Sequence, residues 1–94
     1  MIELIISKGC DPCKKQLEII EKNFAPKEFS IIAVESEEFN KYADKELVEA
    51  VPFIVIKEGN GNIKYAGKGI HEAGQIRKLL KPVKAYNNTK RIKI

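Results

Sequence analysis

The stretch Ser7-Lys8-Gly9-Cys10-Asp11-Pro12-Cys13 determines how the rest of the chain is interpreted. It contains both cysteines of the 94-residue sequence, with two residues between them. An apolar run at residues 2–6 precedes it and predicts a buried strand. Leu17, Ile20 and Phe24 follow it at the spacing of one helical face. The two cysteines are therefore expected where a strand ends and a helix begins.

This placement favours a reactive thiol at Cys10. Pro12 suits the first turn of a helix, where its missing N–H is not needed, so Cys10 is predicted just before the helix. Helix dipoles and unpaired N–H groups stabilise a thiolate, and such settings lower a cysteine pKa from about 8.5 to roughly 3.5–7.5. Lys8 adds positive charge, whereas Asp11 opposes it by destabilising the thiolate or caps the helix. The thiolate is the attacking species in disulfide exchange, so we predict that Cys10 attacks and that Cys13 resolves.

Two other interpretations of the cysteine pair remain open at this point. The cysteines are two inert core thiols in the first, although the charged surroundings argue against it. In the second they bind a metal, but tetrahedral zinc takes four ligands and one pair supplies two. The single histidine, His71, is far away in sequence and is expected to be a solvated residue at the start of the last helix. A dimer would have to pool two pairs around zinc or an iron–sulfur cluster.

The composition is typical of one globular domain, with 44% hydrophobic and 32% charged residues. No apolar run reaches the length of a membrane span, and Glu3 interrupts the first run, which argues against a secretory signal. We therefore expect a cytoplasmic protein. In that compartment a Cys-x-x-Cys pair is more often catalytic or metal-binding than a structural disulfide.

The net charge of +4 comes from the end of the chain. Segment 83–94 carries four cationic side chains and no acidic one, so residues 1–82 are neutral overall. We expect a domain over residues 1–82 and a basic tail over 83–94 that is mobile or adds an edge element. The neutral domain predicts no nucleic-acid partner for the core.

Periodicity predicts the remaining elements. A second strand is expected at 29–34, a third at 53–56 and a fourth at 63–66, with a turn at 58–62 that joins the last two as an antiparallel hairpin. Ser36 is a plausible N-cap for a short helix with Phe39, Tyr42 and Ala43 inward. A flexible link at 67–69 leads to a last helix that buries one apolar face, at Ala73, Ile76, Leu79 and Leu80, and ends at Pro82.

The predicted fold class is α/β. Strand, helix and strand at this spacing imply parallel strands joined by a right-handed crossover. The complete order is βαβαββα, a four-stranded mixed sheet with helices on both faces.

With Cys10-Asp11-Pro12-Cys13 after the first strand and Val51-Pro52 before the third, the chain resembles thioredoxin-fold proteins. By its length and its start at the first strand–helix unit, it is most similar to the glutaredoxin-like members. The resemblance covers residues 1 to about 81 and implies a small thiol-disulfide oxidoreductase that reduces protein disulfides.

The resemblance also implies roles for single residues. Cys10 matches the exposed nucleophile and Cys13 the buried resolving cysteine, so the pair is expected to alternate between dithiol and disulfide. Lys8 resembles a lysine that helps to hold the thiolate, and Pro12 matches the proline before the second cysteine. Pro52 matches a cis-proline that faces the disulfide. Val51 would offer its backbone N–H and C=O to an extended substrate.

Two departures leave the electron donor open. Glutathione-dependent members carry Gly-Gly and an acidic pair before the last helix, whereas here Lys68 separates Gly67 from Gly69 and only Glu72 is acidic. We nevertheless assign Gly67 and Gly69 to substrate binding. Thioredoxins carry a tryptophan before the first cysteine and a buried aspartate in the preceding strand, where this chain has Gly9 and only Glu3.

The expected protein is a monomer without a bound cofactor or a membrane partner. Its substrates are disulfide-containing proteins, and a thioredoxin reductase-like flavoenzyme or glutathione would re-reduce it. The alternative is a binding module of the same fold without turnover, whose thiols serve a metal or simply pack.

Overall fold

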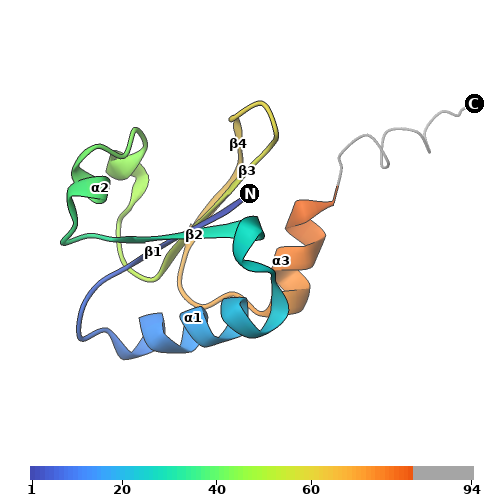
Figure 1. The fold of residues 1–94 in the computed structure, drawn as a ribbon, viewed down its shortest axis with the longest axis horizontal. Helices are drawn as coiled ribbons and strands as arrows, with labels where there is room; N and C mark the ends of the chain where they lie inside the picture. Colours follow the sequence, from blue (N-terminus) through green and yellow to red (C-terminus); the bar gives the residue numbers. More distant parts are fainter. Residues whose placement is uncertain (82–94) are drawn as a thin grey trace, which may run out of the picture.

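Four strands form a single sheet in the computed structural model, which describes residues 1–81. The strands are β1 (Ile2–Ile6), β2 (Phe29–Ala33), β3 (Phe53–Lys57) and β4 (Ile63–Lys68), and their order across the sheet is β2-β1-β3-β4. β1 runs parallel to β2 and antiparallel to β3, and β4 is antiparallel to β3 (Figure 1). The predicted mixed sheet is confirmed. The predicted tail and Pro82 lie outside the described residues.

Helices cover both faces of this sheet. Helix α1 (Asp11–Asn23) and helix α3 (Ala73–Leu80) lie on one side, and the short α2 (Glu37–Asn40) lies on the other (Figure 1). Two single turns of 3₁₀-helix, η1 (Pro26–Glu28) and η2 (Lys45–Leu47), occupy the connections. Ser36 caps α2 as predicted, because its hydroxyl accepts the N–H of Phe39 at 3.2 Å. The arrangement is the thioredoxin-like α/β fold that the sequence predicts.

The core has two layers that meet at the central strands. Leu4 of β1 packs with Ile20 of α1 and Ile76 of α3, and all three side chains are fully buried. Ile5, the next residue of β1, points to the α2 face and packs in the second cluster with Val55. A strand that is buried on both faces needs apolar residues in succession, which explains the consecutive apolar residues Leu4, Ile5 and Ile6 of β1.

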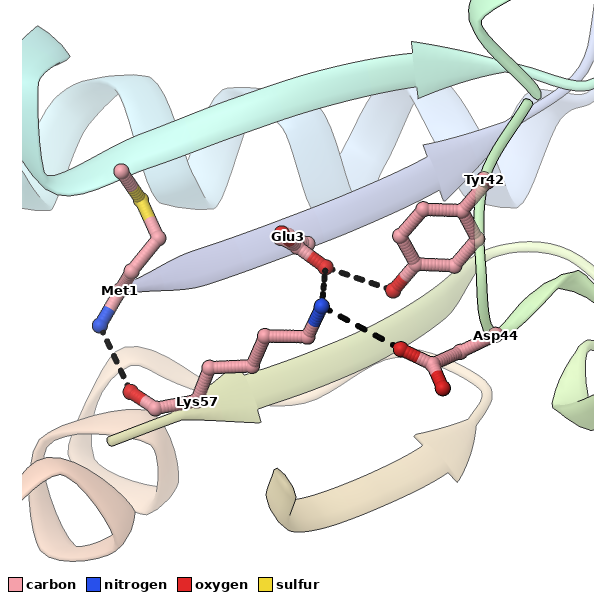
Figure 2. A network of polar contacts seen from close by, with 5 residues as sticks. All are labelled: Met1, Glu3, Tyr42, Asp44 and Lys57. Carbon is pink, nitrogen blue, oxygen red and sulfur yellow. Dashed lines mark hydrogen bonds and ion pairs between the residues drawn. The ribbon is translucent and has the colours of Figure 1, made fainter. Parts of the chain in front are cut away.

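Glu3, Tyr42, Asp44 and Lys57 form a polar cluster, the Glu3 cluster, on the α2 face of the sheet (Figure 2). The Tyr42 hydroxyl donates to Glu3 Oε1 at 2.6 Å, and Lys57 Nζ lies 3.3 Å from Glu3 and 3.2 Å from Asp44. These contacts attach the chain after α2 to β1 and β3. They also satisfy a carboxylate that the first strand half-buries.

The Glu3 cluster shifts the pKa values of two of its members upward. Burial raises the pKa of Tyr42, and the adjacent Glu3 carboxylate raises it further. Burial alone would lower the pKa of Lys57, but the hydrogen bonds and negative charges of Asp44 and Glu3 outweigh it and raise that pKa. Both groups therefore hold their protons more tightly in the folded chain than in the unfolded one.

The structure corrects two details of the sequence prediction. Ala43 is exposed rather than inward, because α2 already ends at Asn40 and the helical period does not extend to position 43. Gly67 lies in β4 rather than in a flexible link, because the strand continues to Lys68. Pairing with β3 explains this extension, since Gly67 lies opposite Ile54 in the register.

We expect Tyr42→Phe to lower the free energy of unfolding by about 1–2 kcal/mol at pH 7, since it removes a hydrogen bond to a carboxylate. Because the pKa values of Tyr42 and Lys57 are raised in the folded chain, their protonated forms stabilise the fold. This stabilisation is complete at pH values below the ordinary pKa values of 10.0 for Tyr42 and 10.5 for Lys57. This stabilisation is lost as the pH rises through the folded-state values. Urea titrations at pH 7, 9 and 10.5 should therefore show a shallower alkaline decline for the variant than for the parent chain. Identical declines would contradict the assignment.

Candidate active site

Cys10 is the N-cap of α1. Its backbone is extended, with φ −99° and ψ 106°, and its Sγ accepts the backbone N–H of Cys13 at 3.1 Å. Its carbonyl oxygen accepts the N–H of Lys14 at 3.2 Å. The prediction that Cys10 directly precedes the helix is confirmed. A sulfur atom thus lies where the first free amides of the helix converge.

Asp11 is the first residue of α1, so the prediction that it caps the helix is wrong. Its side chain is exposed and lies 4.0 Å from the ammonium group of Lys14. A contact between two exposed side chains at this distance contributes little to stability. Pro12 follows in the first helical turn, as its lack of an N–H predicts.

Cys10 and Cys13 form a disulfide with their Cα atoms 5.2 Å apart. Their exposure differs, because Cys10 is half-buried while Cys13 is only 2% exposed. Cys10 is therefore accessible to an approaching group, whereas the protein shields Cys13. Such an asymmetry suits a pair in which one sulfur meets the substrate and the other acts from inside.

The segment Val51-Pro52 lies at the same end of the sheet as the cysteines. The peptide bond between the two residues is cis, as the family resemblance implies, and Pro52 is buried. Phe53, which follows, pairs with Ile5 near the end of β1, so the start of β3 lies beside the strand that leads to Cys10. Within residues 1–81, neither the N–H nor the C=O of Val51 has a hydrogen-bond partner. Both groups are therefore available to an extended chain.

Glu35 holds the loop that leads to Cys10, and the sequence prediction missed it. Its carboxylate accepts the Ser7 hydroxyl at 2.7 Å and the Lys8 N–H at 3.1 Å. These two hydrogen bonds lower the pKa of Glu35. Gly9 completes the loop with a φ of 68°, a value that a residue with a side chain adopts with strain. The available signal was topological, since adjacent parallel strands place the residues that follow them side by side.

His71 is buried, with 4% of its surface exposed, so the prediction of a solvated histidine is wrong. The backbone N–H and C=O of His71 form hydrogen bonds with the side chain of Gln16, a fully buried residue for which the sequence predicted no role. Lys8, in contrast, has an exposed side chain. Gly69 donates its N–H to the carbonyl oxygen of Pro52 at 2.8 Å, so this glycine lies beside the predicted docking segment.

Gly67 has a packing role that its sequence context did not reveal. A Cβ atom at this position would lie 2.4 Å from the hydroxyl oxygen of Tyr65, which crosses directly over the glycine. Real side chains do not approach so closely, so Tyr65 keeps its position only because residue 67 is glycine.

A family model described as "Thioredoxin domain" matches residues 1–81, which is most of the chain. The chain belongs to the thioredoxin domain family. No curated protein matches it. Membership explains why a Cys-x-x-Cys pair at a helix start and a buried cis-proline occur together at one end of the sheet. A thioredoxin-family domain with this disulfide has a redox role of the oxidoreductase type.

Other groupings of potential ligands add little to this site. Over residues 1–81, no group of three or more histidine, cysteine or acidic side chains is placed to hold a metal ion. In the same range, every helix is too short or too polar to cross a membrane.

We expect Glu35→Ala to release the loop before Cys10, whereas Glu35→Gln keeps an acceptor oxygen at the same place. Loss of the hydrogen bond from the Lys8 N–H should make hydrogen exchange at that amide several-fold faster in the alanine variant. The glutamine variant should change much less. NMR spectra measure the exchange of the Lys8 amide in the parent chain and in both variants. Equal exchange rates in all three proteins would show that Glu35 does not restrain the loop.

Proposed function

We propose that this domain reduces disulfides in other proteins, with Cys10 as the nucleophile and Cys13 as the resolving cysteine. The observation that carries the proposal is the unequal exposure of two bonded sulfurs at the start of α1. The accessible sulfur accepts a helix amide at 3.1 Å, which would stabilise a thiolate at that position after reduction.

The first step begins with both cysteines reduced. The Cys10 thiolate attacks one sulfur of the substrate disulfide, and the substrate S–S bond breaks as the new bond to Cys10 forms. The other substrate sulfur leaves as a thiolate and takes a proton from water. The product is a mixed disulfide between Cys10 and the substrate.

The second step closes the ring that the structure contains. The Cys13 thiolate attacks Cys10 Sγ, the Cys10–Cys13 bond forms, and the second substrate sulfur departs. Two electrons have passed from the protein dithiol to the substrate disulfide. The Cα separation of 5.2 Å lies within the usual range for a disulfide, so closing the ring requires no large backbone movement.

The remaining predicted residues support this chemistry. Lys8 contributes positive charge near the thiolate, Asp11 opposes it, and Pro12 starts the helix in the correct conformation. Val51 presents its free peptide groups to an extended substrate segment, which would pair with it as an added strand beside Pro52. We assign Gly69 to the support of this docking segment, on the basis of its hydrogen bond to Pro52.

The assignment of Gly67 to substrate binding stays a prediction. We further propose that the protein acts as a cytoplasmic monomer with no bound cofactor. The electrons would come from a thioredoxin reductase-like flavoenzyme or from glutathione.

Two single substitutions test the proposal by reduction of insulin disulfides with dithiothreitol as the electron source. Cys10→Ser should reduce the rate to that of dithiothreitol alone, because no nucleophile remains at the accessible position. Cys13→Ser should instead accumulate a mixed disulfide with the substrate, visible as an adduct by mass spectrometry. Undiminished insulin reduction by Cys10→Ser would overturn the proposal. A parent chain that never exceeds dithiothreitol alone would favour a binding module without turnover.

A second assay addresses the electron donor. Turnover supported by NADPH and thioredoxin reductase is compared with turnover supported by NADPH, glutathione and glutathione reductase. The chain lacks both the acidic pair of glutathione-dependent members and the tryptophan and buried aspartate of thioredoxins, so its sequence favours neither donor. The system that supports the faster turnover would identify the donor.

A further inference from the structure

A fully buried glutamine, Gln16, connects α1 to the segment that follows β4 by hydrogen bonds. Gln16 Oε1 accepts the backbone N–H of His71 at 2.5 Å, and Gln16 Nε2 donates to the carbonyl oxygen of His71 at 3.0 Å. Both ends of the amide are thus paired with one residue that lies 55 positions away in sequence. A buried polar group without its partner destabilises the fold, so this contact fixes the two segments in one register.

The ring of His71 extends the connection to β4. Nδ1 lies 3.0 Å from the carbonyl oxygen of Gly69, which can only accept, so Nδ1 carries the proton. In the neutral ring Nε2 is the acceptor, and the Tyr65 hydroxyl, 2.7 Å away, donates to it. Tyr65 reaches this position by passing over Gly67, which has no Cβ to obstruct it. We call Gln16, His71 and Tyr65 the His71 network.

The His71 network ends at the predicted docking segment. Gly69, whose carbonyl oxygen accepts from His71, donates its own N–H to the carbonyl oxygen of Pro52 at 2.8 Å. A continuous series of hydrogen bonds therefore runs from α1 through Gln16 and His71 to Pro52. Because α1 begins at the cysteines, this series spans the two sides of the site, the dithiol and the edge at Val51.

Burial alone does not account for a glutamine at this place. Position 16 lies on the same helical face as Cys13 and Ile20, where an apolar side chain would pack without any need for partners. A buried polar pair of this kind adds little net stability compared with an apolar replacement, but it fixes which groups lie opposite each other. The fixed register of Gln16 and His71 would in turn fix the position of Pro52, through the hydrogen bonds of Gly69.

We propose that the His71 network positions Pro52, and with it the free peptide groups of Val51, relative to the dithiol. Gln16, His71 and Tyr65 are positioning residues, since they act through Gly69 and Pro52 and do not touch the substrate. This inference rests on the proposed function, because the Val51 edge matters only for a substrate that docks there. It predicts that the network affects extended substrates more than small disulfides.

Two variants remove different parts of the network, and a third serves as the control. Gln16→Leu leaves the buried N–H and C=O of His71 unpaired, and Tyr65→Phe removes one hydroxyl while the ring stays over Gly67. Gly74→Ala is the matched control on α3, because a Cβ atom at that position meets no atom within 4 Å. Should Gln16→Leu fail to fold, Tyr65→Phe still gives a complete test.

The first measurement is hydrogen exchange at the Gly69 amide, which reports the bond to Pro52 directly. We expect exchange to be roughly tenfold faster in Gln16→Leu and about threefold faster in Tyr65→Phe, with no change in the control. The ¹⁵N spectrum of His71 should show a protonated Nδ1 in the parent chain. The Nε2 resonance should shift in Tyr65→Phe, because it loses its donor.

The second measurement compares two substrates, a peptide with one internal disulfide and the small aromatic disulfide 5,5′-dithiobis(2-nitrobenzoate). The ratio of kcat/KM for the peptide to kcat/KM for the small disulfide should fall about tenfold in Gln16→Leu, mainly through KM. Tyr65→Phe should lower the ratio less, and the control should leave it unchanged.

Folded variants with an unchanged ratio and unchanged Gly69 exchange would overturn the proposal and leave the network a purely structural role. An equal loss with both substrates would also overturn it, since the network would then act on the dithiol. If the parent chain reduces neither substrate, the proposed function fails separately. Gly69 exchange then still decides whether the network holds the Pro52 segment.

Discussion

Every α-helix begins with backbone N–H groups that have no partner within the helix, and at the start of α1 a cysteine sulfur supplies one acceptor. Cys10 Sγ accepts the Cys13 N–H at 3.1 Å, and this hydrogen bond has two effects. It caps the helix, and it holds the sulfur where a negative charge is stabilised by the helix dipole. The capping position of α1 is therefore also the position proposed for the reactive sulfur. The strands and loops before α1 hold Cys10 at this position.

The sheet delivers the two halves of the site to one end. β1 is central, paired with β2 on one side and β3 on the other, and buried on both faces. Its end leads into the loop that Glu35 restrains, while the antiparallel β3 starts beside it, directly after Pro52. Because these strands are fixed by their pairing, a short loop is enough to bring Cys10 and the Val51 edge to the same end of the sheet.

The sequence predicted the fold well because its signals are local. Apolar runs define β1, β2 and β3, and alternation of apolar with polar residues defines β4. Ser36 caps α2 and Pro12 marks the first turn of α1, each through chemistry within a few residues. The cis form of the bond before Pro52 came from the family resemblance, since only a small minority of X–Pro bonds are cis without such context. The location of Cys10 and Cys13 between a strand and a helix was also predicted, and the roles proposed for them were inferred from that location.

The polar contacts between distant elements were missed for the opposite reason. Gln16 and His71 are 55 residues apart, and nothing in the sequence near either residue indicates that they contact each other. Gln16 did lie on the apolar face defined by Cys13 and Ile20, which could have indicated its burial. Glu35 required the parallel register of β1 and β2 before its proximity to Ser7 became evident. Ala43 was misplaced because a helical period was extended beyond the end of α2.

The pairing of β1 has a consequence for biosynthesis. The strand and the two cysteines are made before β3, and the strand gains its antiparallel neighbour only after residues 53–57 have been synthesised. Partial chains that end before β3 therefore contain both thiols without the complete fold, in which Cys13 is buried. The nascent polypeptide thus passes through a stage in which its two thiols are more open to air oxidation or to foreign thiols than in the finished protein.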